Sequence, residues 1–299
     1  MKKIVPTNQR EQIENNLINV RLFELYANPI TGSYDLELLK KINKHLFQDF
    51  PKLEWAQNYT PGEFRPELSP DKFWGKKRIL KDHSDYSMVV YSNMSAEDIQ
   101  RTSNYLKDNI DITKLSLLKP AAFAKAIGEI YVQLDYLHPF PDGNSRTIRE
   151  FTRNLSYDCG YNLDWSKFVL TNADYDRLYL GRDISVNRIS VEKLPFSEIK
   201  FDLLDSLDKF NNYKPLPELL KDAVNSRQWS KEQLQKFVYD QLSTGKSLEW
   251  IEKYLSTDSR VPGANILKRK LFLSYVMKDA QKTYPPLHKL LSRSNELER

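Results

Sequence analysis

One short stretch of the chain, His138 to Arg149, gathers side chains suited to chemistry on phosphate groups. It reads His-Pro-Phe-Pro-Asp-Gly-Asn-Ser-Arg-Thr-Ile-Arg. Pro139 disfavours helical geometry in the residue before it, so one helix should end at His138 and another should begin near Asn144. The first backbone N–H groups of that second helix have no acceptor within the helix, which makes them a natural anion site.

Two arginines extend this anion site. Arg146 and Arg149 are three residues apart, so both project from one face of the predicted helix, and Arg153 continues the row. Guanidinium forks match the oxygens of phosphate groups, and the arrangement therefore favours a polyphosphate ligand. Taken singly, Arg149 and Arg153 could equally form a solvated helix face.

His138 and Asp142 complete the set. A carboxylate beside phosphate oxygens is a common way of holding Mg²⁺. The imidazole of His138 lies across the predicted loop, where it could accept a proton from an attacking group. Each residue alone has an ordinary explanation, because His138 suits a helix C-terminus and Asp142 or Asn144 suits an N-cap. Their occurrence together favours the chemical interpretation.

Helices should flank this stretch on both sides. Apolar residues recur at intervals of three and four in both flanking segments, as an amphipathic helix requires. In 119–137 they are Phe123, Ile127, Ile130, Leu134 and Leu137, and in 144–159 they are Ile148, Phe151, Leu155 and Cys159. Gly160 stands where a helix C-cap is expected, and Cys159 should be a buried apolar residue.

The only strand signal lies in 73–91, where two β-prone segments flank a polar connection and predict one hairpin. From about 195 onward the pattern is helical, and the prolines near 215 suggest a boundary at 200–217. We therefore predict a mainly α protein with two parts, a catalytic region over 1–200 and a helical region of unknown role over 201–299. Residues 230–275 could contain a helix-turn-helix, but a plain helical bundle is favoured.

Composition sets the broad limits. The chain has 299 residues, 28% of them charged, with a net charge of +5. Global disorder is excluded, nucleic acid is not an expected partner, and no segment should span a membrane. One cysteine forbids an intrachain disulfide, and no histidine has a metal-ligand partner at useful spacing. Without a signal-peptide pattern, the protein is expected in the cytoplasm or delivered into a host cell.

The stretch 138–149 resembles the signature of the Fic family, H-x-F-x-[D/E]-G-N-G-R-x-x-R, at every fixed position except one. Looser likeness covers roughly residues 15–200 and includes 61–65 and 160–165. The resemblance implies an α-helical core with a β-hairpin flap over the active site. Most family members transfer AMP from ATP to a Ser, Thr or Tyr hydroxyl of a target protein and release pyrophosphate.

The resemblance also implies roles for individual residues. His138 would deprotonate the target hydroxyl, Phe140 would anchor the loop in the core, and Asp142 would hold Mg²⁺ between the α- and β-phosphates of ATP. Gly143, Asn144 and Ser145 would form the anion cradle, while Arg146 and Arg149 would hold the β- and γ-phosphates.

Ser145 is the departure, because the family most often has Gly there. Doc-type members carry Lys at this position and phosphorylate their targets. Ser is small and uncharged like Gly, so AMP transfer is favoured over a Doc-like phosphotransferase or a catalytically weak nucleotide-binding module. Its Cβ adds bulk close to phosphate. We therefore expect Ser145→Gly to keep or raise AMP transfer.

Two kinds of partner follow from the resemblance. The target protein should dock along the hairpin flap, 73–91, by edge pairing with strand 87–91. Many family members are also inhibited by a glutamate in the pattern [S/T]-x-x-x-E-[G/N]. Glu37, Glu296 and Glu14 each match only part of that pattern. A separate antitoxin polypeptide could supply the glutamate, or this form of inhibition could be missing.

Overall fold

The protein is mainly helical, with two small sheets. The structure, a computed structural model, describes residues 6–69, 72–82, 85–258, 260, 261, 269 and 273. Its helices are α1 (Thr7–Ala27), α2 (Leu36–Phe47), α3 (Ala96–Asn109), α4 (Ile112–Leu115), α5 (Pro120–Leu137), α6 (Asn144–Asp158), α7 (Asn172–Lys193), α8 (Glu198–Lys209), α9 (Leu216–Leu219), α10 (Lys231–Ser243) and α11 (Leu248–Thr257). Short 3₁₀ helices are η1 (Phe50–Lys52), η2 (Trp165–Phe168) and η3 (Leu220–Asp222). The strands are β1 (Trp74–Ile79), β2 (Tyr86–Tyr91), β3 (Tyr161–Leu163) and β4 (Val224–Ser226). None of the described helices is long and apolar enough to cross a membrane.

The two helices predicted around the motif are confirmed. Helix α5 ends at Leu137, and His138 caps it in the left-handed conformation, with φ of 46°. Helix α6 ends at Asp158, with Cys159 as its cap, and Gly160 follows at positive φ. The apolar stripes of both helices meet in the main core, where Phe123, Leu134, Phe151 and Cys159 are fully buried. The motif loop is thus held between two helices that share one core.

Gly143, which joins the loop to α6, occupies a place that no other residue could take. Its φ is +77°, a left-handed conformation that disfavours residues with a Cβ. A Cβ there would also lie 2.1 Å from the ring of Phe47 on α2. The close approach of α2 therefore requires glycine at the start of α6.

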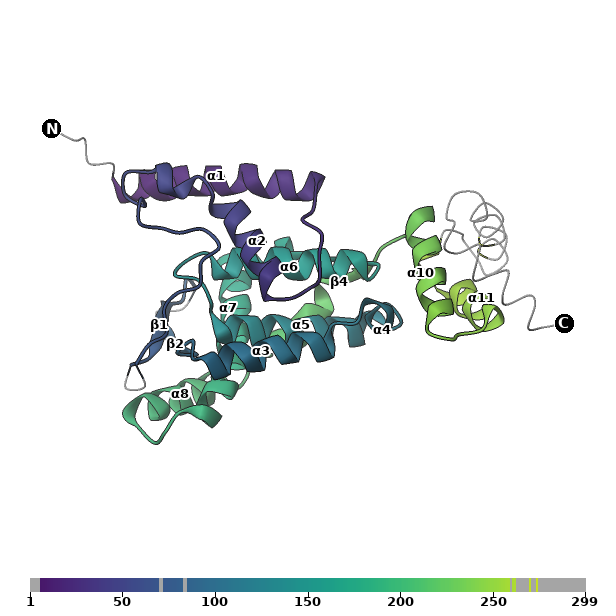
Figure 1. The fold of residues 1–299 in the computed structure, drawn as a ribbon. Helices are drawn as coiled ribbons and strands as arrows, with labels where there is room; N and C mark the ends of the chain where they lie inside the picture. Colours follow the sequence, from purple (N-terminus) through teal and green to yellow (C-terminus); the bar gives the residue numbers. More distant parts are fainter. Residues whose placement is uncertain are drawn as a thin grey trace.

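The predicted hairpin is confirmed as the antiparallel pair β1–β2, in which Trp74 faces Tyr91 and Ile79 faces Tyr86. In Figure 1 the hairpin lies at one end of the molecule, beside α7 and α8. Side chains from these helices cover the outer edge of β2. Asn187 bonds Val90 N–H and Met88 C=O, and Ser190 donates to Val90 C=O.

The expectation that strand 87–91 offers the docking edge is therefore wrong, because α7 already occupies that edge. The unpaired edge of the two-stranded sheet belongs to β1. Leu80 N–H donates to Asp85 C=O, so by the alternation of an antiparallel ladder the N–H groups of Gly75, Lys77 and Ile79 point outward.

A second two-stranded sheet, β3–β4, was not predicted. Each strand has only three residues, too few for a recognisable alternation, and β3 pairs with β4 from far along the chain, Asn162 facing Asn225. Through this pairing, Val224 of β4 becomes part of the main hydrophobic core. The division of the chain at residue 200 stays a prediction.

Helices α10 and α11 form a second, smaller core around Trp229, Leu234, Val238, Ile251 and Leu255. Figure 1 shows this pair at the opposite end of the molecule from the hairpin. The helical character expected of the tail holds for these two helices. Most of the remaining tail, including Lys268, Lys270 and Glu296, lies outside the described residues.

Candidate active site

The motif loop, the start of α6, the hairpin and α7 enclose a cavity of about 400 Å³. All six polar site residues expected to act on phosphate or substrate line it together with Gly143. They are His138, Asp142, Asn144, Ser145, Arg146 and Arg149. The hairpin adds Trp74, Lys76, Arg78 and Tyr91, and α7 adds Tyr175, Tyr179 and Arg182. The sequence-predicted residues are therefore brought to one place, and cationic side chains dominate the lining.

The His138 ring is held firmly in this cavity. It stacks on Tyr91 with ring centroids 3.7 Å apart, and its backbone carbonyl accepts a hydrogen bond of 2.8 Å from Arg65 Nε. Burial lowers the pKa of His138 below its usual value, although the nearby Asp135 carboxylate opposes that shift. The imidazole is therefore neutral near pH 7, as a general base must be.

The loop between His138 and α6 is closed by Asn144. Its side-chain oxygen accepts a hydrogen bond from Phe140 N–H, and its amide donates to Phe140 C=O. Phe140 itself is fully buried, and its anchoring role stays a prediction. The Asn144 side chain thus shapes the loop, and its contribution to an anion cradle would come from the backbone.

One of the three expected cradle donors is already engaged. Gly143 N–H donates to Oδ1 of Asp142 at 2.6 Å. The N–H groups of Asn144 and Ser145 have no acceptor among the described residues, and neither has that of Arg146, because the first bond back is from Thr147 N–H to Gly143 C=O. The start of α6 therefore offers three backbone donors to an anion, two of them from the expected cradle, together with the positive end of the helix dipole.

Arg146 and Arg149 have no carboxylate partner among the described residues, whereas Arg78 and Arg182 of the same cavity are paired with Asp183 and Asp135. Arg149 Nε is buried without a hydrogen-bond acceptor, and its Nη2 lies 3.5 Å from the Tyr179 hydroxyl. A buried guanidinium without an acceptor is costly, which points to an anionic ligand. Arg153 does not share this role, because it pairs with Glu150 through two hydrogen bonds.

Several residues that line the cavity or lie directly behind it were not identified from the sequence. Asp135 had a detectable signal, since it stands one helical turn before His138 on the same helix. Arg182, Tyr179 and Arg78 had none, because only the packing of α7 and β1 brings them to the motif. They make the cavity more basic than the motif alone suggests.

Tyr179 is the most unusual of these residues. Its ring lies 4.1 Å from the Arg78 guanidinium. Burial opposes ionisation, but Arg182, Arg149 and other neighbours lower the pKa of Tyr179 to about 7. The hydroxyl therefore exchanges a proton in the neutral range, close to the unpaired Arg149.

Asp142 is the residue expected to bind Mg²⁺. It is exposed at the cavity, and Oδ1 accepts the Gly143 N–H, which leaves Oδ2 without a hydrogen bond among the described residues. No cluster of three metal-ligating side chains occurs in the described part of the chain. A lone carboxylate suits Mg²⁺ when phosphate oxygens and water complete the shell, so Asp142 fits that ion.

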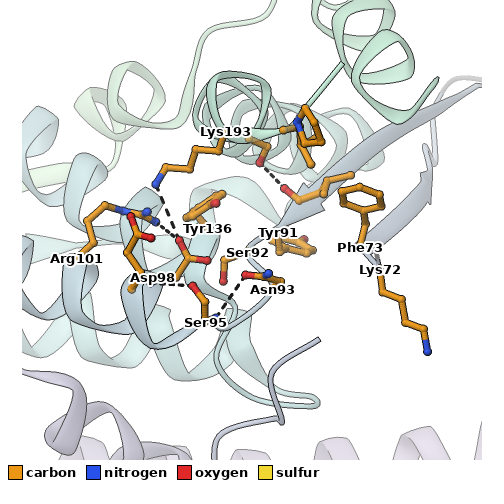
Figure 2. Close-up of a pocket in the computed structure, with 15 residues that line it drawn as sticks. Lys72, Phe73, Tyr91, Ser92, Asn93, Ser95, Asp98, Arg101, Tyr136 and Lys193 are labelled. Carbon is orange, nitrogen blue, oxygen red and sulfur yellow. Dashed lines mark hydrogen bonds and ion pairs between the residues drawn. The ribbon is translucent and has the colours of Figure 1, made fainter. Parts of the chain in front are cut away.

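A second cavity, of about 360 Å³, lies on the other side of Tyr91 and is shown in Figure 2. Of its three cations, Arg101 and Lys193 turn toward Asp98, at 2.8 and 3.9 Å, and Lys72 points away from them (Figure 2). With Arg101 and Lys193 paired, this cavity is a poorer phosphate site than the one containing His138.

Glu14 and Glu37, the described glutamates that partly match the inhibitory pattern, do not contact either motif arginine. Glu37 pairs with Lys40 on α2, and Glu14 on α1 accepts a hydrogen bond of 2.7 Å from Trp55. Glu296 lies outside the described residues. A separate antitoxin polypeptide stays a prediction.

A helical core carries a hairpin over a basic cavity, in which a histidine lies beside a helix N-terminus. Residues 33–155 match the model of the Fic/DOC family. The chain is 31% identical over 180 residues to "Protein adenylyltransferase VbhT" of Bartonella schoenbuchensis. The aligned residues make up 58% of this chain and 32% of that protein. It is 26% identical over 166 residues to "Probable protein adenylyltransferase y4lH" of Sinorhizobium fredii, covering 54% of the chain and 70% of the relative. The chain thus spans only about a third of the first of these relatives.

Solved structures show a more distant likeness. The BepC protein of Bartonella tribocorum with bound AMPPNP is 16% identical, with a TM-score of 0.46, over 75% of this chain and 90% of that one. An N-terminal Fic domain from Bartonella quintana with bound ADP is 19% identical, with a TM-score of 0.46, over 78% and 91%. A likeness at this level says nothing about the chemistry of this chain.

Proposed function

We propose that this protein is a protein adenylyltransferase, which transfers AMP from ATP to a Ser, Thr or Tyr hydroxyl of a target protein. One observation carries the proposal: a neutral histidine shares a cavity with the free N–H groups at the start of α6 and with two arginines that have no carboxylate partner in the described part of the chain. This set can bind a polyphosphate and deprotonate a hydroxyl in the same place. Both curated relatives are named protein adenylyltransferases, the second as probable.

In this proposal His138 removes the proton from the target hydroxyl as its oxygen attacks the α-phosphorus of ATP. The bond to the bridging oxygen breaks, and pyrophosphate leaves. The N–H groups of Asn144 and Ser145, with Arg146 and Arg149, hold the phosphate oxygens and stabilise the charge that moves onto pyrophosphate. Asp142 would hold Mg²⁺, which supplies further charge neutralisation when bound.

The target would dock by strand addition to β1. Gly75, Lys77 and Ile79 offer outward N–H and C=O groups on the unpaired edge, and the neighbouring Trp74, Lys76 and Arg78 line the cavity. A segment paired to that edge would run along the cavity mouth. Main-chain pairing of this kind gives affinity without demanding one target sequence.

Labelled ATP tests the reaction type. The protein is incubated with a cell lysate and Mg²⁺, using ATP labelled at either the α- or the γ-phosphate. Label transferred only from the α-position supports AMP transfer. Label transferred only from the γ-position would replace it with a Doc-like phosphotransferase, and no transfer together with ATP binding would leave a nucleotide-binding module.

A further inference from the structure

Two buried side chains outside the motif, Asp135 on α5 and Arg182 on α7, form an ion pair behind the cavity. Arg182 Nε and Nη2 donate to the two carboxylate oxygens of Asp135 at 3.0 and 2.9 Å. Each side chain is only 2% exposed. A buried pair contributes little to stability compared with apolar packing, because desolvating both charges offsets their attraction. Its location beside the site therefore suggests another role.

One end of the pair faces the base. Asp135 Oδ1 lies 3.6 Å from Nδ1 of His138, and that nitrogen has no hydrogen-bond partner among the residues that the structure describes. A carboxylate opposite Nδ1 favours the tautomer that carries its proton there and leaves the lone pair on Nε2. The separation exceeds a hydrogen bond, but such contacts often tighten when substrate binds.

The other end of the pair reaches the anion cradle. Arg182 Nη1 donates to the Ser145 hydroxyl at 3.1 Å. Ser145 is in the first turn of α6, where its backbone N–H is one of the free donors. A glycine at this position would have no oxygen to accept the bond, so the departure from the family pattern has a partner in this chain.

We propose that Asp135 and Arg182 are positioning residues that hold the base and the cradle as one unit, with Asp135 fixing the tautomer of His138 and Arg182 fixing Ser145. The inference deepens the proposed function and rests on it. It also revises the expectation for Ser145→Gly, which should now weaken the site because Arg182 loses its contact with α6.

The charged groups around His138 determine how removal of the Asp135 carboxylate would change the pH dependence of the rate. The groups facing the imidazole are Asp135 on its own helix, Arg182 on α7, Arg65 in the segment before the hairpin, and the Tyr91 ring on β2. Asp135 is the only negative charge among them. Removing it leaves two arginines, which disfavour protonated His138 and move the acid limb of the rate profile to lower pH.

The kinetic test compares Asp135→Asn with the wild type by single-turnover transfer from α-labelled ATP between pH 5 and 9. We expect a fall in the plateau rate of about 10-fold or more, an acid limb at lower pH and little change in KM for ATP. The matched control is Glu150→Gln, which removes another buried carboxylate paired twice with an arginine, but away from the cavity. An unmoved acid limb in Asp135→Asn, or the same shift in Glu150→Gln, would overturn the positioning role.

A second readout does not depend on catalysis. Nitrogen–proton correlation spectra report which ring nitrogen of His138 carries the proton, and His138→Ala identifies the signal among the four histidines. The wild type should show the Nδ1–H tautomer, and Asp135→Asn should lose that preference. An unchanged His138 tautomer in Asp135→Asn would contradict this inference, even if the enzyme is active. The expected tautomer in a protein that never transfers label would instead refute only the proposed function.

The cradle end is tested with Ser145→Ala and Ser145→Gly. Both remove the oxygen that Arg182 contacts, and loss of one such bond should raise KM for ATP about 3- to 10-fold without moving the acid limb. Transfer as fast as the wild type with an unchanged KM in both variants would show that the Arg182 contact does not position the cradle.

Discussion

His138 stacks on Tyr91, the last residue of β2, with the two rings inclined by only 24°. The proposed base is therefore supported by the same hairpin whose other strand is proposed to receive the target. Tyr91 is 5% exposed and also lines the cavity. Target docking and orientation of the base are thus linked through one small sheet.

Replacing the Tyr91 ring should impair transfer through this support. Tyr91→Ala leaves His138 free to rotate, and we expect the single-turnover rate to fall about 10-fold or more, since small misplacements of a reacting group are costly. Tyr91→Phe keeps the ring and should stay within about threefold of the wild type. Equal losses in both variants would show that the hydroxyl, and not the stacked ring, is what matters.

His138→Ala should abolish transfer while ATP binding survives, because removal of a general base costs about 10²- to 10⁴-fold in rate. Binding is measured by calorimetry with a non-hydrolysable ATP analogue. His45→Ala on α2 is the control, since His45 does not line the cavity. Transfer within about threefold of the wild type in His138→Ala would contradict the assignment.

Arg149→Ala should weaken ATP binding about 10- to 100-fold, because hydrogen bonds between charged groups are among the stronger ones. Arg149 Nε has no acceptor in the described part of the chain, so its removal should cost the fold little. The control is Arg188→Ala, which removes an exposed arginine of α7. Unchanged affinity in Arg149→Ala would remove the main support for a polyphosphate ligand.

Tyr179 should make ATP binding depend on pH. Its pKa of about 7 means that the hydroxyl is neutral below that pH and a phenolate above it. The phenolate competes with phosphate for the surrounding guanidinium groups, so affinity should fall as pH rises from 6 to 8. Tyr179→Phe should remove this fall.

ATP itself titrates in the same range, and the comparison therefore needs a variant that leaves Tyr179 in place. Tyr105→Phe on α3 serves, because Tyr105 does not line the cavity and burial raises its pKa to about 12. Tyr105→Phe should keep the wild-type pH dependence. Identical curves for the two variants would show that ATP, and not Tyr179, is responsible.

A proline at position 77 tests the docking edge. The Lys77 N–H points away from β2, so Lys77→Pro removes an outward donor without breaking the hairpin ladder. Target labelling should fall several-fold while ATP affinity stays constant, and Lys77→Ala should have much less effect because it keeps the N–H. Equal effects of both changes would mean that the Lys77 charge, and not edge pairing, attracts the target.

The sequence predicts those parts of the fold that depend on interactions between residues close together along the chain. Helices α5 and α6 and the turn between them follow from local periodicity, from Pro139 and from Gly143. The side of the hairpin that α7 would cover depends on contacts between Val90 and Asn187, almost a hundred residues apart. No local pattern records such contacts.

The candidate site divides in the same way. The motif residues are contiguous, so their types and spacing predicted a single phosphate site. Arg182 reaches Ser145 only because α7 packs against α5, and Tyr179 acquires its low pKa from arginines on other elements. Asp135 lies between these cases, since its spacing from His138 was visible but its partner was not.

The single cysteine of the chain has a practical consequence for following the hairpin in solution. Cys159 is fully buried at the end of α6, and burial raises the pKa of its thiol, so it resists alkylation. A thiol introduced by Ile79→Cys, at a β1 residue that is 81% exposed, would be the one site a maleimide dye reaches. Fluorescence from that dye could then report the binding of a target segment to the β1 edge. No residue other than Ile79 would need to be changed.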